Sequence, residues 1–205
     1  MKPPSASSSI RVSLNTGLGA FAHVGQNEFE AGQAVGRRFS DEGAKHLVCV
    51  IHVAGNIGLE DRCRGVKDTF TGTVDNVQVD IANIVDAGNT IQSTLLSDTS
   101  IDGVVTLGAQ IAIAARQARD DAGSSAVIGT FDMSEDVLDA VSAGTILFAV
   151  DQQPYLQGYM PVVMLELYIS NGNILGGGEL VRTGPNFITK DDAAQVLEFA
   201  KNGTR

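Results

Sequence analysis

Polar side chains follow two successive apolar runs in the second half of the chain. Residues 126–131 (AVIGTF) have the length and composition of a buried strand and are followed directly by Asp132. Residues 145–150 (TILFAV) form a similar run and are followed by Asp151 and Gln152. Open α/β sheets bind their ligands at the carboxyl ends of parallel strands. The pattern therefore predicts a polar binding site at one sheet edge, although a single strand-end aspartate also occurs in solvated turns.

The elements that would position these side chains alternate along the chain. Residues 134–144 illustrate one helix: Ser134 is an N-cap residue, two acidic residues follow in the first turn, and Gly144 closes the segment. About five strand–helix units of this kind lie between residues 25 and 170. Such alternation predicts an α/β fold with a doubly wound parallel sheet and right-handed crossovers.

Length and composition restrict the class of protein. The chain has 205 residues, 43% of them hydrophobic, which suffices for one large or two modest domains. Its net charge of -10 provides no basic face, so we expect no nucleic-acid partner. No apolar run approaches the ~20 residues of a membrane span, and the start, MKPPSASSS, lacks the apolar region of a signal peptide. The chain is therefore cytoplasmic, or a signal was never part of this sequence.

The residue types that usually perform catalysis are not arranged for it. His23, His46 and His52 lack the spacing of metal ligands, and there is no nucleophile elbow, P-loop or dinucleotide fingerprint. We therefore expect no enzyme, no resident metal and no cofactor, although an α/β enzyme remains an alternative class. The two cysteines, Cys49 and Cys63, do not define a disulfide framework. They are either two buried thiols or, in an oxidising compartment, a bridge.

The stretch GTFDMSEDVLDAVSAGTILFAVDQQPYLQGY (residues 129–159) resembles the C-terminal region of type 1 periplasmic sugar-binding proteins. These are the solute receptors of ribose-type ABC importers, and they share a core with lac-repressor-type regulators. The resemblance covers roughly residues 10 to 200. It implies non-catalytic binding of a sugar or similar polyol, a membrane permease as partner, and a periplasmic location. The alternative is the effector-binding core of a lac-repressor-type regulator.

Matching motif to motif assigns ligand-binding roles to individual residues. Arg62, which starts the R-x-R-G motif, takes the position of the ligand-binding arginine, and Asp132 takes that of the aspartate in the FD pair. Gln152 takes the position of the glutamine two residues before the proline. Asn15, in SLNTG, stands where ribose-type proteins carry an aspartate, and Gln26 lies near the first crossing between the lobes.

Two further positions of the family's site depart from its pattern. Gly108 stands where ribose-type members carry an amide side chain, so one sugar contact is lost or replaced. Asn83 lies near a position that is often aromatic, and the chain has no tryptophan. The resemblance therefore leaves the identity of the sugar open.

The resemblance also predicts how the chain divides into lobes. Residues 26–152 and 185–205 correspond to a nearly complete C-terminal lobe, whereas residues 1–25 and 153–184 correspond to a remnant of the N-terminal lobe. We therefore expect a truncated receptor that binds sugar weakly or not at all. In the family the strands equivalent to residues 10–14 (IRVSL) and GELVR lie side by side, covered by the helix that starts near residue 156. An unpaired edge of that small sheet predicts self-association.

Overall fold

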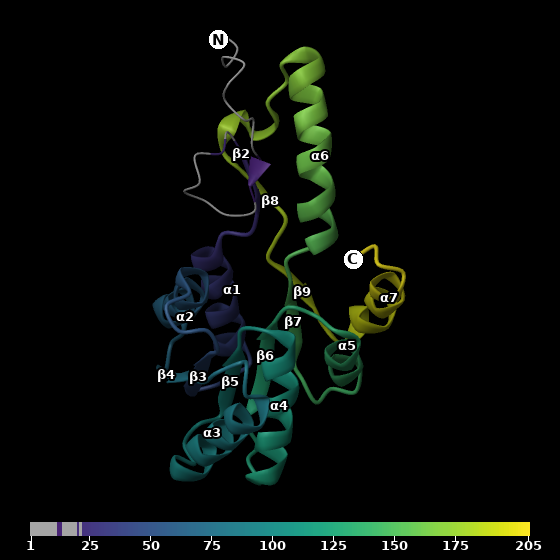
Figure 1. Cartoon of the computed structure of the whole chain (residues 1–205). Helices are drawn as coiled ribbons and strands as arrows, with labels where there is room; N and C mark the ends of the chain where they lie inside the picture. Colours follow the sequence, from purple (N-terminus) through teal and green to yellow (C-terminus); the bar gives the residue numbers. More distant parts are fainter. Residues whose placement is uncertain (1–11, 14–19, 21) are drawn as a thin grey trace.

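The computed structural model describes residues 12–13, 20 and 22–205 and contains two β-sheets (Figure 1). The larger sheet has six strands in the order β4-β3-β5-β6-β7-β9. Its strands are β3 (His46–Ile51), β4 (Thr73–Gln78), β5 (Gly103–Thr106), β6 (Val127–Phe131), β7 (Phe148–Asp151) and β9 (Asn186–Ile188). All neighbours pair in parallel except β7 and β9, which are antiparallel. The predicted α/β fold is confirmed, with one antiparallel edge strand added to the parallel sheet.

Helices cover both faces of the larger sheet. Six helices cover this sheet: α1 (Glu28–Asp41), α2 (Ile57–Thr69), α3 (Ile84–Ser97), α4 (Ala109–Asp121), α5 (Glu135–Ser142) and α7 (Lys190–Lys201). In β3, Leu47 and Cys49 face the core beneath α1 and α2, whereas Val48 and Val50 face the core beneath α3, α4, α5 and α7. This alternation follows from the two-residue period of a strand, and burial on both faces explains why the run is continuously apolar.

Aromatic packing fixes the core beneath α1. The ring of Phe148 makes edge-to-face contacts with Phe39 at 5.4 Å and with Phe187 at 5.1 Å between centroids. Phe148 lies on β7, Phe39 on α1 and Phe187 on β9, so these rings join the sheet to its covering helix. Fully buried aromatic pairs of this geometry are among the largest contributions to a core.

The smaller sheet has three strands in the order β1-β2-β8, all parallel. They are β1 (Val12–Ser13), β2 (Ala22–Gly25) and β8 (Leu180–Arg182). The prediction that IRVSL and GELVR are neighbours is wrong, because β2 lies between them. The run AHVG has only four residues, but it pairs with both strands and has the burial pattern of a central strand.

The remaining elements connect the two sheets. The chain leaves the larger sheet after β7, forms α6 (Pro154–Asn171) and a short 3₁₀ helix (Leu175–Gly178), and returns through β8 to β9. Helix α6 packs against β1 and β2, as expected for the helix that covers the smaller sheet. Figure 1 shows that α6 lies apart from the six helices that cover the larger sheet.

Candidate ligand-binding site

Two of the predicted site residues meet at the carboxyl ends of adjacent strands. Asp132 follows β6 and Gln152 follows β7, and the strands are in register with Phe131 opposite Val150. The amide Nε2 of Gln152 donates a hydrogen bond to Oδ1 of Asp132. Asp132 has a φ of 65°, a left-handed conformation that is uncommon outside glycine and that recurs at ligand sites. Its backbone N–H bonds to the carbonyl of Val150 at 3.0 Å, which holds the carboxylate at the end of the sheet.

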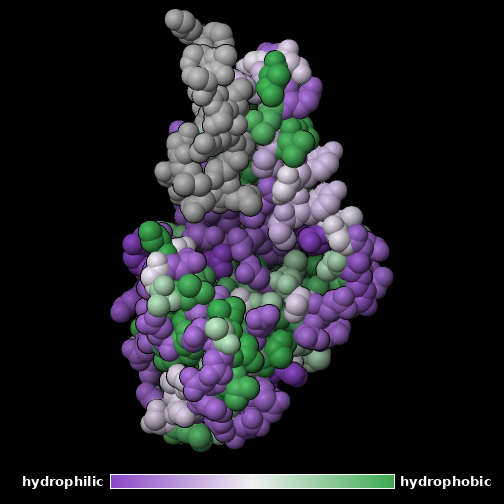
Figure 2. Space-filling model, in the orientation of Figure 1, coloured by the Kyte–Doolittle hydropathy of each residue, from purple (hydrophilic) through white to green (hydrophobic). Residues whose placement is uncertain are grey.

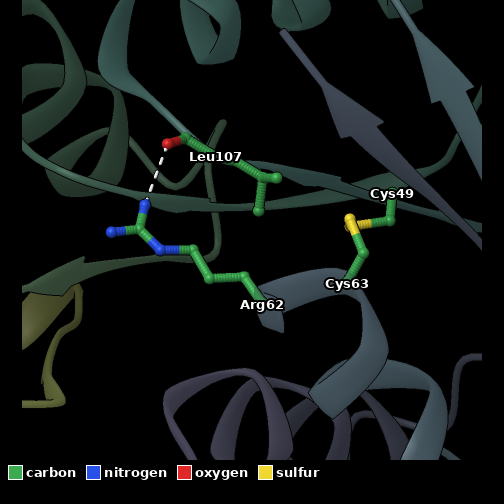
Figure 3. The surroundings of a disulfide bond; sticks show 4 residues. All are labelled: Cys49, Arg62, Cys63 and Leu107. Atoms are coloured by element: carbon green, nitrogen blue, oxygen red, sulfur yellow. Dashed lines mark hydrogen bonds between the residues drawn. A yellow bond between two sulfur atoms is a disulfide. The ribbon is translucent and has the colours of Figure 1, made fainter. Parts of the chain in front are cut away.

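Arg62 reaches the same edge from helix α2. Only 6% of the residue is exposed. Its Nε donates to Oε2 of Glu28 at 2.7 Å, and Nη1 donates to the carbonyl of Leu107 at 3.1 Å (Figure 3). The guanidinium lies 4.5 Å from the centroid of the Phe131 ring, which directly precedes Asp132. These contacts satisfy a buried cation and place it at the ends of β5 and β6.

Gln26 is linked to this group through Glu28. Its Nε2 donates to Oε2 of Glu28 at 2.9 Å, the same oxygen that accepts from Arg62. Gln26 is 6% exposed. A Cβ added at Gly184 would lie 2.8 Å from Oε1 of Gln26 and 3.4 Å from Cα of Gln152, so the two glutamines are close together. Among the described residues Oε1 of Gln26 is a buried acceptor without a hydrogen-bond partner.

Gly108 lies at the same edge, next to His52. Gly108 is the N-cap residue of α4, and a Cβ added there would lie 3.0 Å from Cε1 of His52. Burial is the main cause that lowers the pKa of His52; the charge of Arg62 lowers it further and that of Asp132 opposes the shift. His52 is therefore within electrostatic range of both charged residues of the site. Sequence reasoning missed it, although it follows the apolar run of β3 as Asp132 follows that of β6.

A hollow of about 310 Å³ lies beside Asp132 and Gln152. Its lining residues are Asp132, Met133, Ser134, Asp151, Gln152, Pro154, Ala200 and Arg205. Asp151 is 1% exposed; its Oδ2 pairs with Nε of Arg205 at 2.7 Å and its Oδ1 accepts from the backbone N–H of Gln153, also at 2.7 Å. Arg205 was not predicted, because it lies 54 residues from Asp151 and only the fold brings the two together.

The two remaining candidate residues are Asn83 and Asn15. Asn83 is exposed and caps α3, where its Oδ1 accepts a hydrogen bond from the backbone N–H of Asp86 at 3.2 Å. Its side chain therefore caps the helix that follows the edge strand β4 and does not join Arg62 and Asp132. Asn15 lies outside the described residues.

A disulfide joins the two cysteines directly behind the site (Figure 3). Cys49 lies on β3 and Cys63 on α2, both buried, with Cα atoms 5.8 Å apart. Of the two alternatives that the sequence left open, the bridge is present and the pair of thiols is not. Because Cys63 is the neighbour of Arg62, the bridge ties the helix that carries Arg62 to β3, the strand next to the edge strand β4.

Other kinds of site find little support in the described residues. Among them, no group of three or more His, Cys, Asp and Glu side chains could hold a metal ion. None of the helices in the described part of the chain combines the length and apolar character that crossing a bilayer requires.

Comparison with known proteins decides the family. The model of the periplasmic binding protein domain matches residues 12–173, well over half of the chain. The chain belongs to this family. The predicted resemblance to periplasmic binding proteins is thereby confirmed.

Several similar proteins are named for, or were solved with, a sugar or polyol. The xylose/arabinose-binding protein XylF of Sulfolobus acidocaldarius is 24% identical over 186 residues, which cover 85% of this chain and 46% of that protein. A carbohydrate transporter from Acidothermus cellulolyticus, solved with myo-inositol, superposes with a TM-score of 0.86 at 48% identity, covering 91% of this chain and 65% of that one. A periplasmic ribose ABC transporter from Conexibacter woesei, 19% identical, shares the fold with a TM-score of 0.78; the match covers 91% of this chain and 65% of that one. This periplasmic binding protein chain thus spans about half the length of the curated relative that it matches.

Proposed function

We propose that this chain is part of a non-catalytic receptor that binds a sugar or similar polyol for an ABC importer. The observation that carries the proposal is the convergence of Arg62, Asp132, Gln152 and Gln26 at one edge of the sheet. A sugar hydroxyl both donates and accepts hydrogen bonds. A guanidinium donates, a carboxylate accepts and an amide does both, so this set suits several hydroxyls on one small ring.

The relatives support the same chemical class. One is named for binding xylose and arabinose, and another was solved with myo-inositol. All three ligands are compact rings or chains rich in hydroxyl groups. No observation on this chain favours the effector-binding core of a regulator, so that alternative is not pursued. We also propose a membrane permease as partner and a periplasmic location, because both are typical of the family. The proposal includes a division into two lobes, with boundaries after residues 25, 152 and 184.

A titration of sugars tests the proposal. We expect one member of a panel of myo-inositol, D-xylose, L-arabinose and D-ribose to shift the backbone amide signals of Asp132 and Gln152 in ¹H–¹⁵N spectra. Asp132→Ala should weaken that binding by about 1–3 kcal/mol, because it removes a charged hydrogen-bond partner. Asp139→Ala, which removes a carboxylate from the exposed side of α5, is the matched control and should leave the affinity unchanged. Spectra that stay unchanged at millimolar sugar concentrations, or an affinity that Asp132→Ala does not alter, contradict the proposal.

We further propose that the 205-residue chain self-associates through helix α6. Tyr155, Tyr159, Val162 and Ile169 recur at helical spacing along α6 and are all exposed large hydrophobic residues. The Tyr155 and Tyr159 rings stack at 5.9 Å. Figure 2 shows apolar residues at the surface around the far end of this helix. Exposed apolar faces of this kind favour association with another chain.

Light scattering after gel filtration measures this association. We expect the wild-type chain to elute as a dimer or larger species and Val162→Lys to shift it toward the monomer, because a charge then lies in the centre of the exposed stripe. Asn171→Lys, an exposed polar position on the face of the same helix that points away from the stripe, is the control and should leave the mass unchanged. A wild-type chain that is monomeric at all concentrations would show that the stripe is not an interface between copies.

A further inference from the structure

His52 is a buried polar side chain that the proposed set of ligand contacts does not include. The residue is 8% exposed, and its Nδ1 has no hydrogen-bond partner among the described residues. Its backbone is fixed, because its carbonyl accepts a hydrogen bond from the N–H of Ile81 at 3.1 Å. Buried polar groups in proteins are nearly always hydrogen-bonded, so an unpaired one at this edge of the sheet needs a partner that the described residues do not supply.

Glycine at position 108 is explained by the space that His52 takes. Gly108 has φ −169° and ψ 152°, an extended conformation that any residue adopts, so the backbone does not require glycine there. A Cβ at this position would instead lie 3.0 Å from Cε1 and 3.4 Å from Nε2 of His52. A side chain at position 108 would therefore press against the imidazole and shift it by a few tenths of an ångström. The histidine of β3 stands where a side chain from the start of α4 would otherwise point.

His52 lies beside Gly108 and within electrostatic range of the charged residues of the site. Arg62 and Asp132 both act on it electrostatically, from α2 and from the end of β6. Its pKa lies below the usual 6.5, chiefly through burial, so the imidazole is neutral at neutral pH. A neutral imidazole offers one N–H donor and one acceptor nitrogen, which is the pair of functions that a single hydroxyl group matches. Gln26, which shares Glu28 with Arg62, has a second buried acceptor without a partner among the described residues.

We propose that His52 binds one hydroxyl of the ligand directly and thereby helps to decide which polyol the receptor accepts. This inference rests on the proposed function. Gly108 supports this role, because the absence of a side chain at that position leaves space for the imidazole. The receptor therefore recognises that hydroxyl with an imidazole from the end of β3 rather than with a side chain from the start of α4.

Deoxy analogues of the bound polyol provide the test. Affinities of the wild-type chain and of His52→Phe are measured by NMR titration for the polyol and for each analogue that lacks one hydroxyl. His52→Phe keeps a ring in the site but removes both nitrogens, and we expect at least a tenfold loss of affinity for the parent polyol. For one analogue the two proteins should bind equally, because the hydroxyl that His52 contacts is already missing. His46→Phe, at the opposite end of β3, is the matched control and should change no affinity.

The imidazole signals of the wild-type chain provide a readout that needs no variant. Ligand should shift the ¹⁵N resonances of His52 and leave those of His46, which bonds to Ser100 and Asp75, in place. This measurement decides the question if His52→Phe does not fold. Gly108→Ala should also weaken binding, because its Cβ displaces the imidazole, and it should have no further effect in a His52→Ala background.

The outcomes separate the two proposals. If the wild-type chain binds no polyol, the proposed function fails and the role of His52 fails with it. If the wild-type chain binds a polyol, but His52→Phe binds it equally well and the His52 resonances do not move, only the role of His52 is overturned. An equal loss of affinity for the parent and for every deoxy analogue shows a structural role alone and also overturns the inference.

Discussion

The region around the larger sheet and the region around the smaller sheet differ in how completely they bury their apolar residues. The six-stranded sheet has helices on both faces and two large clusters of buried side chains. Among the described residues, the core of the three-stranded sheet contains Ala22, Val24 and Met164, with Met160 and Val181 packed against it. Arg62 lies on α2 and Asp132 follows β6, so both belong to the first region. Gln26 and Gln152 lie on segments that connect the two sheets. The two charged ligand groups are therefore held by the part of the chain that has a full core.

The helices of the two regions show the same contrast. Helix α5 buries one stripe, Val137, Leu138, Ala140 and Val141, and exposes acidic residues on its other face. Helix α6 is longer and more apolar, yet among its residues only Met164 is fully buried. A helix that is apolar all round is typical of one that other elements cover on several sides. The difference indicates that α6 is adapted to more neighbours than the described residues give it.

The largest effect that we expect separates the two regions directly. Phe148→Ala should lower the free energy of unfolding by about 3–5 kcal/mol, because a fully buried ring packed between Phe39 and Phe187 leaves a cavity. Tyr159→Ala, at a residue that is 55% exposed on α6, should change it by less than about 0.5 kcal/mol. Urea unfolding followed by circular dichroism measures both. Similar losses for the two variants would mean that α6 is as well covered as the larger sheet.

Removing the disulfide should have the next largest effect. Cys49→Ala combined with Cys63→Ala should lower the free energy of unfolding by about 2–4 kcal/mol, since the bridge closes a loop of 14 residues and so restricts the unfolded chain. Guanidinium unfolding with and without dithiothreitol measures the loss in the wild-type chain and should show none in the double variant. An unfolding curve of the wild-type chain that dithiothreitol leaves unchanged would contradict the prediction.

The well-packed region is also the one that the sequence predicted best. The apolar runs before Asp132 and Gln152 predicted two adjacent parallel strands, and the rule on strand ends placed their polar residues together. These inferences succeed because a strand buried on both faces needs a continuous apolar run, which is a local signal. Arg62 came from the family resemblance, because no local pattern distinguishes it from Arg64 two residues later.

The failures have physical causes in non-local pairing. Strand β2 has four residues, and its partner β8 lies more than 150 residues away, so nothing local shows that it forms the centre of a sheet. The same holds for the antiparallel strand β9 and for the contact of Arg205 with Asp151. His52 was missed for another reason. The apolar run HLVCVIHV continues past His52, whereas β3 ends at Ile51, so the sequence does not mark His52 as a residue at a strand end.

The smallest effect concerns an ion pair that joins the two regions. Arg182 on β8 pairs with Glu30 on α1, and its Nη2 lies 3.0 Å from Oε1 of the carboxylate. Arg182→Gln should lower the free energy of unfolding by no more than about 1 kcal/mol at neutral pH, because both side chains are largely exposed and screened by water. The hydrogen bond between the two side chains holds the pKa of Glu30 below its usual 4.5 and raises the pKa of Arg182 above its ordinary value.

The sign of the pH dependence follows from the lowered pKa of Glu30. A carboxylate with a depressed pKa in the folded state stabilises the fold above its unfolded pKa, and the contribution disappears as the pH falls through the folded pKa. The wild-type chain and Arg182→Gln should therefore differ slightly in urea midpoint near about pH 7, and the difference should vanish near about pH 2–3 or in about 1 M salt. Arg37→Gln, which removes an exposed charge from the same helix as Glu30, is the control. A loss for Arg182→Gln that approaches the loss for the disulfide variant would show that this ion pair, rather than the covalent chain and the packing around β2, holds the smaller sheet to the larger one.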